Sequence, residues 1–299
     1  MSPSGVHSSK KEEKKPQLII DGFAVANAIL EELKKRILKF KRKPSLAFIR
    51  VGEHPPSLTY IRMKQKKCEE VGILSIDREF KETISEENLL KEVALLSQDP
   101  SVDGILIQLP LPAHIDTSQV IDHIDPSKDV DGFHPLNMGK LLLGQRDGFF
   151  PCTPYGIMTL LARSAIDPSG KHVVILGRSN LVGKPLAALL IQKEKGANAT
   201  VTLAHKASRD LLRLCQSADI LVAAMGAPRF VKEEMVKAGT VVIDVGITRL
   251  EGGIVGDVDF ERVAPKCAFI TPVPGGVGPM TIAMLLSNTV LSFERRRGS

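Results

Sequence analysis

The stretch of sequence that decides the fold is HVVILGRSNLVGKPLAALLI, residues 172–191. An apolar run typical of a buried strand leads into Gly177, and a short loop then leads through Gly183 into an apolar helix. Parallel sheets present phosphate groups to a helix N-terminus in this way, because free backbone N–H groups and the helix dipole favour an anion there. The spacing is GxxxxxG rather than GxGxxG, so an ordinary strand-to-helix turn is the alternative interpretation.

The strand that follows, ATVTLA at residues 199–204, bears on which dinucleotide is bound. NAD-selective sites usually end this strand with Asp or Glu, which accepts a hydrogen bond from the ribose 2′-hydroxyl. Here His205 and Lys206 follow instead, and Arg178 stands directly after the first glycine. Arg178 and Lys206 would neutralise a 2′-phosphate, so we expect NADP as the cofactor. The alternative interpretation is that both are solvated surface cations.

Strand and helix patterns alternate along the rest of the 299 residues. Alternation of this kind predicts a mostly parallel sheet covered on both faces, and the length fits two domains. We therefore predict an α/β fold with two α/β domains, the second a Rossmann-type NAD(P)-binding domain, and a cleft between them. The expected strands are 45–51, 74–80, 103–108, 172–176, 199–203, 220–223 and 241–245, and the expected helices are 57–71, 85–97, 154–165 and one that follows an N-cap at Asp21.

Pro151 and Pro154 mark the expected boundary between the domains. Residues 18–150 are then the first, catalytic domain, and residues 151–279 are the dinucleotide-binding domain. The final helical stretch, 280–295, is expected to fold back and complete the first domain. Residues 1–17 are polar and rich in lysine, and we expect them to form a disordered tail.

The composition excludes several classes of protein. No apolar run approaches the roughly 18 to 20 residues that span a bilayer, so no membrane association is expected. Much of the net charge of +6 comes from KKEEKK at 10–15 and ERRR at 294–297, and with two Tyr and no Trp the stacking platforms of nucleic-acid binders are missing. The four cysteines form no CxxC pair, which argues against a metal site or a disulfide framework and favours a reducing cytoplasm.

Three polar features of the first half are candidates for a substrate site. Tyr60 and Lys64 lie four apart in a helical pattern and therefore share a face. Gln108 closes an apolar strand, where ligands bind in open α/β sheets. Asp129 and Asp131 lie in the turn-rich segment KDVDGFHP. Each has a structural alternative: a solvated lysine, a cap at a strand end, and ordinary turn chemistry.

Taken together, these segments resemble the bifunctional methylenetetrahydrofolate dehydrogenase/methenyltetrahydrofolate cyclohydrolase family, from about Leu18 to Phe293. Several of the matching motifs are long, and all follow one another in order. They are SLTYIRMK (57–64), DGILIQLPLP (103–112), DPSKDVDGFHPLNMGKL (125–141), PCTPYGI (151–157), VVILGRSNLVGKP (173–185), VVIDVGI (241–247), VGDVDF (255–260) and TPVPGGVGPMTIAML (271–285).

The resemblance implies roles for residues of the first half, which becomes the folate-binding domain. Tyr60 would stack on the folate, and Lys64 would be the key residue of the cyclohydrolase reaction. Gln108 would hydrogen-bond near Lys64 and tune it, while Asp131 would bind the pterin. The loop of Pro274, Gly275, Gly276, Val277 and Gly278 would lie between folate and cofactor.

On the cofactor side, the resemblance places Arg178, Ser179 and Lys206 near the ribose phosphate, although family members often have serine at the position of Lys206. The full set of expected cofactor contacts is Gly177, Arg178, Ser179, Gly183, Lys206 and Ile247.

The implied activity is NADP-dependent oxidation of 5,10-methylenetetrahydrofolate to 5,10-methenyltetrahydrofolate, followed by hydrolysis to 10-formyltetrahydrofolate. The implied setting is one-carbon metabolism and purine biosynthesis, and the implied assembly is a homodimer. A dehydrogenase of another small substrate, such as a shikimate-type enzyme, and a catalytically silent NADP- or folate-binding regulator are the rival interpretations.

Overall fold

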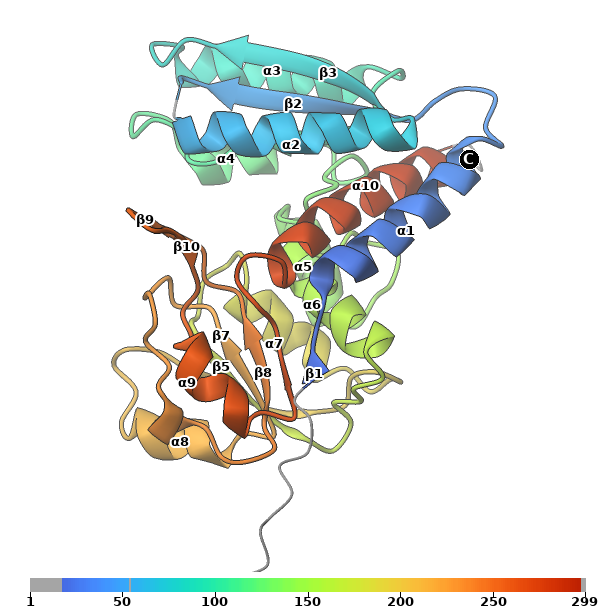
Figure 1. The fold of residues 1–299 in the computed structure, drawn as a ribbon. Coiled ribbons are helices and arrows are strands. Elements are labelled where there is room, and N and C mark those ends of the chain that lie inside the picture. Colours follow the sequence, from blue (N-terminus) through green and yellow to red (C-terminus); the bar gives the residue numbers. More distant parts are fainter. Residues whose placement is uncertain (1–17, 54, 297–299) are drawn as a thin grey trace, which may run out of the picture.

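The first half of the chain builds a small parallel sheet. The structure is a computed structural model that describes residues 18–53 and 55–296. In this sheet β2 (Ser45–Val51) lies between β3 (Leu74–Phe80) and β4 (Gly104–Ile107), and both pairings are parallel. Every residue of β2 is buried, because the strand is central and helices cover both faces (Figure 1).

Different helices cover the two faces of this small sheet. The helices concerned are α1 (Gly22–Ile37), α2 (Pro55–Val71), α3 (Glu86–Gln98), α4 (Thr117–Asp122) and α10 (Val277–Arg295). Ala47 and Ile49 share a core with α3 and α4, whereas Leu46 and Phe48 share one with α1, α2 and α10. Because side chains alternate along a strand, this pattern places one helix layer on each face.

The second half of the chain builds a six-stranded sheet in the order β1-β11-β8-β7-β5-β6, with every pairing parallel. Its strands are β1 (Leu18–Ile19), β5 (His172–Leu176), β6 (Thr200–Ala204), β7 (Ile220–Ala223), β8 (Val241–Asp244) and β11 (Phe269–Ile270). Since β5 pairs with β6 on one side and β7 on the other, the strand order reverses at β5. In open α/β sheets, ligands bind beyond the carboxyl ends of the strands at such a point.

Further helices and a hairpin surround the larger sheet. They are α5 (Pro135–Leu142), α6 (Cys152–Arg163), α7 (Gly183–Leu190), α8 (Leu211–Ser217), α9 (Phe260–Val263), the 3-10 helices Glu233–Met235 and Ala264–Lys266, and the antiparallel pair β9 (Thr248–Leu250) and β10 (Gly253–Val255). The predicted class, α/β with mostly parallel sheets, is confirmed.

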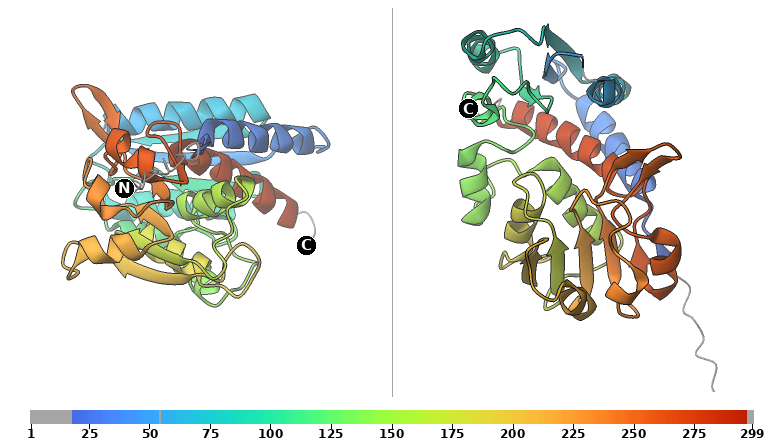
Figure 2. Two further views of the ribbon diagram at one scale, coloured as in Figure 1. Left: turned by 60° about the horizontal axis from the view of Figure 1, so that its bottom comes forward. Right: turned by 90° about the vertical axis from the view of Figure 1, so that its left-hand side faces the viewer.

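Three long helices join the two halves of the molecule. α10 packs against both α1 and α6, and these helices lie between the two sheets in Figures 1 and 2. The C-terminal helix therefore returns to the first half, and it begins three residues earlier, at Val277, than the sequence pattern at 280–295 predicts.

The first described strand belongs to the second sheet. Leu18 and Ile19 pair with Phe269 and Ile270, although residues 18–150 were expected to form one domain. A two-residue strand has no periodicity that reveals its partner, so the sequence gives no sign of this pairing. The described chain therefore starts in the six-stranded sheet and reaches the smaller sheet through α1.

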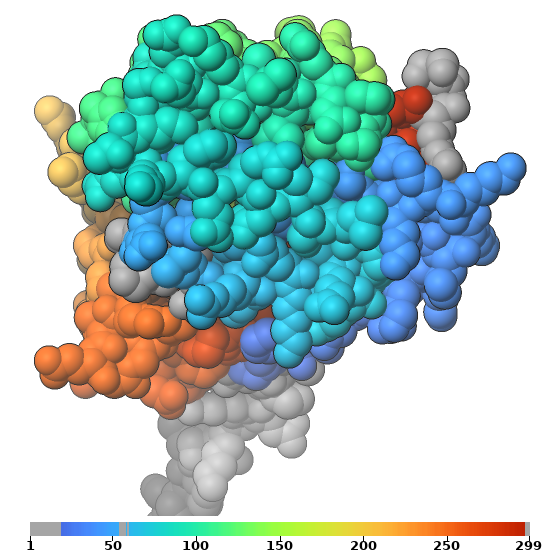
Figure 3. Space-filling model, turned by 90° about the horizontal axis from the view of Figure 1, so that it is seen from above, coloured from blue at the N-terminus to red at the C-terminus, as the bar shows by residue number. Residues whose placement is uncertain are grey.

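Seen from above, residues of the first half form most of the surface, and part of the second half emerges at one edge (Figure 3). Within residues 18–53 and 55–296, no helix is both long enough and apolar enough to cross a membrane. The predicted tail, residues 1–17, lies outside the described residues.

Candidate active site

Lys64 on α2 and Gln108 at the end of β4 meet, although 44 residues separate them in the chain. The Lys64 Nζ donates to Gln108 Oε1 at 3.3 Å. The other end of the amide is fixed, because Gln108 Nε2 donates to the carbonyl of Leu109 at 2.9 Å. The amide oxygen is therefore held toward the lysine, at the strand end where a ligand is expected.

The surroundings of Lys64 lower its pKa below the usual 10.5, chiefly because burial disfavours the ammonium. The charge of Asp131 acts in the opposite direction, as do the thiols of Cys152 and Cys68 to a smaller extent. A neutral amine is accordingly more accessible near neutral pH than on an exposed lysine, and a neutral amine can accept a proton.

Asp131 is half-buried in the turn that follows Val130. Burial raises its pKa, while the nearby Lys64 ammonium lowers it and the Asp129 carboxylate raises it further. The carbonyl of Asp131 accepts from the Cys152 N–H at 3.3 Å, which ties the turn to the start of α6. A small cavity beside this turn is lined by Ile105, Ile107, Leu109, Ile121, Ile124, Asp129, Asp131 and Phe133.

Asp129 organises the turn that carries Asp131. Its side chain is 2% exposed, and every donor that it binds lies within the next eight residues. Those donors are the backbone N–H groups of Gly132 (3.1 Å), Phe133 (3.2 Å) and His134 (2.8 Å) and Nδ2 of Asn137 (2.8 Å). The sequence signal was only an aspartate in a turn-rich segment, and the number of donors that converge on it could not be foreseen.

Tyr60 lies one helical turn before Lys64 on α2 and is half-buried, as is Lys64. The two side chains therefore share a face of the helix. Stacking of Tyr60 on a ligand stays a prediction.

The turn after β5 requires both of its glycines. Gly177 has φ +119°, and a Cβ on it would lie 2.0 Å from the carbonyl oxygen of Ala224. A Cβ on Gly183 would lie 1.9 Å from the carbonyl oxygen of Gly177, so the helix start contacts the turn itself. Ser179 Oγ accepts from the Val182 N–H at 3.1 Å and so stabilises the loop between them.

The predicted cofactor cations lie beyond the carboxyl ends of two adjacent strands. Arg178 follows β5, Lys206 follows β6, and both are exposed. Ile247 follows β8 and is 48% exposed, with its Cδ1 3.9 Å from where a Cβ on Gly278 would lie. The strand ends thus combine two cations with an exposed apolar side chain beside the loop 274–278.

That glycine loop is the point where the N-terminal helix meets the second half. Gly275 and Gly276 are buried, whereas Pro274 is exposed. Gly275 has φ +108°, which favours glycine, and a Cβ on Gly22 would lie 1.8 Å from the carbonyl oxygen of Gly276. The backbone of the loop and the start of α1 therefore approach as closely as two glycines permit.

Comparison with known proteins places this arrangement in a family. Residues 20–131 match the tetrahydrofolate dehydrogenase/cyclohydrolase catalytic domain, and residues 151–297 match the NAD(P)-binding domain of the same family. The chain belongs to the tetrahydrofolate dehydrogenase/cyclohydrolase family. The bifunctional protein FolD of Protochlamydia amoebophila is 55% identical over 93% of this chain and 98% of its own.

Solved structures of this family share the fold. The bifunctional FolD enzyme of Campylobacter jejuni is 49% identical and superimposes with a TM-score of 0.91 over 94% of this chain and 100% of its own. The Trypanosoma brucei methylenetetrahydrofolate dehydrogenase-cyclohydrolase, solved with NADP and an inhibitor, is 38% identical with a TM-score of 0.90 over 95% and 100%. The resemblance predicted from the motifs and the Rossmann-type second domain are thereby confirmed, and the predicted cleft and residue roles stay predictions.

Proposed function

We propose that this chain catalyses two consecutive reactions: oxidation of 5,10-methylenetetrahydrofolate by NADP⁺, and hydrolysis of the resulting 5,10-methenyltetrahydrofolate to 10-formyltetrahydrofolate. Family membership supports the pair of activities. The observation that carries the chemistry is the half-buried hydrogen bond of 3.3 Å between Lys64 and Gln108. It lies close enough to Asp131 for the charges of the lysine and the aspartate to shift each other's pKa.

In the oxidation, the protein chiefly positions the reactants. The methylene carbon loses a hydride, for which bound NADP⁺ supplies the acceptor. The adjacent folate nitrogen stabilises the cation that remains, so no protein acid or base is required. Tyr60 would stack on the folate and Asp131 would accept hydrogen bonds from the pterin, and together they would hold the carbon in place.

In the hydrolysis, Lys64 would move the proton. Water attacks the methenyl carbon, and a neutral Lys64 amine accepts a proton from that water as the C–O bond forms. The ammonium then returns this proton to the ring nitrogen as the C–N bond breaks. The hydroxyl on the former methenyl carbon loses its remaining proton to solvent as the C=O bond forms, which leaves the formyl group on the other nitrogen. Gln108 would keep the amine oriented through these steps, because its own Nε2 is held by a backbone carbonyl.

The residues of the second half fit a phosphorylated dinucleotide. A close backbone approach at Gly177 and Gly183 leaves the start of α7 open to a phosphate. Arg178 and Lys206 carry positive charge on adjacent strand ends, where an NAD-selective site would have an acid. We therefore infer a preference for NADP over NAD.

We also infer that the enzyme works in the cytoplasm as a homodimer and supplies formyl groups for purine biosynthesis. All four cysteines are free and buried, which suits a reducing compartment. Light scattering of the purified protein tests the dimer.

The deciding experiment supplies purified protein with methylenetetrahydrofolate and either NADP⁺ or NAD⁺, and measures reduced cofactor and formyl product separately. Lys64→Met should lower cyclohydrolase turnover by about 100-fold or more, the usual worth of a positioned acid–base group, and should affect hydride transfer less. Lys66→Met is the matched control, since Lys66 is exposed on the same helix. Unchanged hydrolysis in Lys64→Met would remove Lys64 from the mechanism.

A further inference from the structure

Two buried carboxylates lie behind the dinucleotide edge, and the chemistry above makes no use of them. Asp244 ends β8 and is 3% exposed, and Asp257 precedes α9 and is 0% exposed. They belong to the segments VVIDVGI and VGDVDF. Buried carboxylates are costly unless they are hydrogen-bonded, so their partners indicate their purpose.

Asp257 holds the turn that follows β7. Its Oδ2 accepts from the backbone N–H groups of Met225 at 2.6 Å and Gly226 at 2.9 Å. The preceding residue, Ala224, is the one whose carbonyl oxygen would lie 2.0 Å from a Cβ on Gly177. Asp257 thus fixes the backbone against which the phosphate-binding turn packs, at the point where the strand order reverses.

Asp244 holds the turn that follows β8. Its Oδ1 accepts from the N–H groups of Gly246 and Asp257, both at 2.9 Å, and its Oδ2 accepts from that of Val258 at 2.9 Å. Gly246 leads directly into the exposed Ile247, beside the glycine loop. The contact with the Asp257 N–H also joins the two carboxylates into one unit.

Glycines make room for this pair. A Cβ on Gly256 would lie 1.9 Å from Asp244 Oδ2, and a Cβ on Gly246 would lie 2.4 Å from Asp257 Oδ1. That Asp257 oxygen is buried and has no hydrogen-bond partner among residues 18–53 and 55–296. Only glycine fits at these two positions, so the backbone of the turns lies directly against the two carboxylates.

We propose that Asp257 and Asp244 are positioning residues for the dinucleotide: they fix the turns at 225–226 and 245–247, and these turns support the cofactor without either carboxylate touching it. The inference rests on the proposed function, because it assumes that the dinucleotide lies at this edge. The cyclohydrolase reaction needs no dinucleotide and therefore reports separately on the folate side.

The test compares Asp257→Ala and Asp257→Asn with Asp259→Asn, a matched change two residues along whose carboxylate pairs with Lys232 at 3.2 Å. NADPH affinity is measured by calorimetry, and hydrolysis is measured with methenyltetrahydrofolate alone. The alanine variant leaves two N–H groups without an acceptor, and we expect about tenfold weaker NADPH binding, which corresponds to about 1.4 kcal/mol. In the asparagine variant a neutral amide oxygen replaces a charged one, so about threefold weaker binding is expected.

The hydrolysis rates of both Asp257 variants should stay within about twofold of the rate of the unsubstituted protein. The NADPH affinity of Asp259→Asn should also stay within about twofold, a change in binding free energy of less than about 0.5 kcal/mol. NADPH affinity unchanged in both Asp257 variants would overturn the proposal, and so would a parallel fall in hydrolysis. If the alanine variant does not fold, the asparagine variant decides alone. The unsubstituted protein is measured first: failure to bind NADPH or to turn over methylenetetrahydrofolate would count against the proposed function, not against the positioning role.

Discussion

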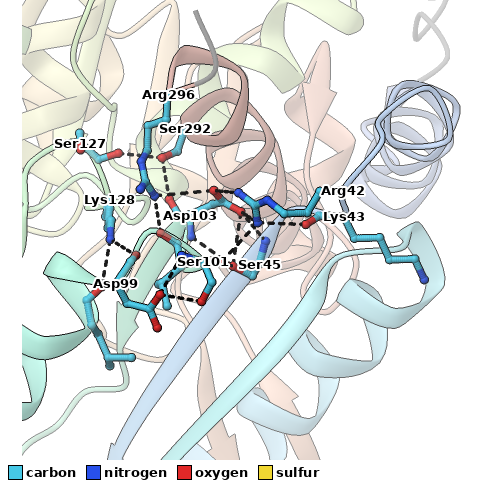
Figure 4. Close-up of polar contacts among 12 residues, drawn as sticks. Arg42, Lys43, Ser45, Asp99, Ser101, Asp103, Ser127, Lys128, Ser292 and Arg296 are labelled. Atoms are coloured by element: carbon cyan, nitrogen blue, oxygen red, sulfur yellow. Dashed lines mark hydrogen bonds and ion pairs between the residues drawn. The ribbon is translucent and has the colours of Figure 1, made fainter. Parts of the chain in front are cut away.

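Replacement of Asp103 by alanine should destabilise the protein while leaving its chemistry intact. Asp103 precedes β4, and its carboxylate has a side-chain exposure of 1%. It accepts from both terminal nitrogens of Arg42, at 2.9 and 2.8 Å, and from the backbone N–H of Ser45 at 2.8 Å (Figure 4). Arg296, directly after α10, lies 3.6 Å away. One carboxylate therefore joins the starts of β2 and β4 to the end of the C-terminal helix.

The size of the destabilisation depends on which partners of Asp103 lose a hydrogen bond in the alanine variant. Loss of one partner of a fully buried ion pair costs about 3–5 kcal/mol. The Arg42 side chain is 42% exposed and regains water, so its share of that cost is small. The Ser45 N–H is buried and loses a charged acceptor, which costs about 1–3 kcal/mol. With the weaker Arg296 contact also lost, we expect a destabilisation of about 3 kcal/mol.

Urea unfolding followed by circular dichroism measures this change as a shift of the midpoint, since the chain has no Trp to serve as a fluorescent reporter. Glu251→Ala, in the exposed turn between β9 and β10, is the control and should stay within about 0.5 kcal/mol. Ser45 and Asp103 lie at the amino ends of their strands, away from Gln108 at the carboxyl end, so both activities of the folded variant should persist. A destabilisation no larger than that of the control would refute the reasoning, as would lost hydrolysis in a fully folded variant.

Three further perturbations have defined outcomes. Gly183→Ala places a Cβ 1.9 Å from the Gly177 carbonyl oxygen, so the KM for NADP⁺ should rise at least about tenfold while hydrolysis of methenyltetrahydrofolate persists. An unchanged KM would contradict the close approach of Gly183 to Gly177. Asp129→Asn turns an amide NH₂ toward donors such as the His134 N–H and so disturbs the turn that carries Asp131. The folate KM should therefore rise about tenfold in both reactions. A rise in only one reaction would show that the two reactions do not both depend on this turn. Burial raises the pKa of Asp244 from 3.8 to about 6, so the native state holds this proton more tightly than the unfolded state. Stability present below pH 3.8 is therefore lost as the pH rises through about 6, and at about 1.4 kcal/mol per pH unit the full loss is about 3 kcal/mol. About 1.4 kcal/mol of this loss falls between pH 5 and pH 7.5, and unfolding midpoints at these two pH values should show it in the unsubstituted protein but not in Asp244→Asn.

Much of the fold could be predicted because its central strands are continuous apolar runs. The strands 45–51 and 172–176 were expected at the bounds that the structure has, since strands buried on both faces are mainly apolar and stand out from the polar segments around them. The Asp21 cap was also foreseeable, and its Oδ1 accepts from the Ala24 N–H at 3.0 Å. The strands β1, β9, β10 and β11 were missed, because two or three residues carry no period and are paired only by the tertiary fold.

The residues of the candidate site also divide into those that the sequence predicts and those that it does not. Helical spacing and a polar strand end were enough to single out Lys64 and Gln108, and the structure brings them together. Among the supporting carboxylates, Asp129 was noted only together with Asp131 in a turn-rich segment, and Asp244 and Asp257 were not singled out. Each lies next to a turn, where aspartate is common, and the donors that distinguish it are mainly backbone N–H groups, which no side-chain pattern encodes.

Of the three helices that join the two halves, α10 links the glycine loop to the turn that carries Asp131. α10 begins within the glycine loop, and midway along it Asn288 donates to the carbonyls of Val130 at 2.8 Å and Phe150 at 3.2 Å. Val130 directly precedes Asp131. Near its end, Ser292 donates to the carbonyl of Asp103 at 2.6 Å. Because a helix is a stiff rod, these three attachments hold Asp131 at a defined place relative to the loop 274–278. In the proposed function, two consecutive reactions occur at one folate carbon, and this fixed spacing would serve both, since hydride transfer depends on the position of the carbon and the proposed proton transfer depends on the position of Lys64.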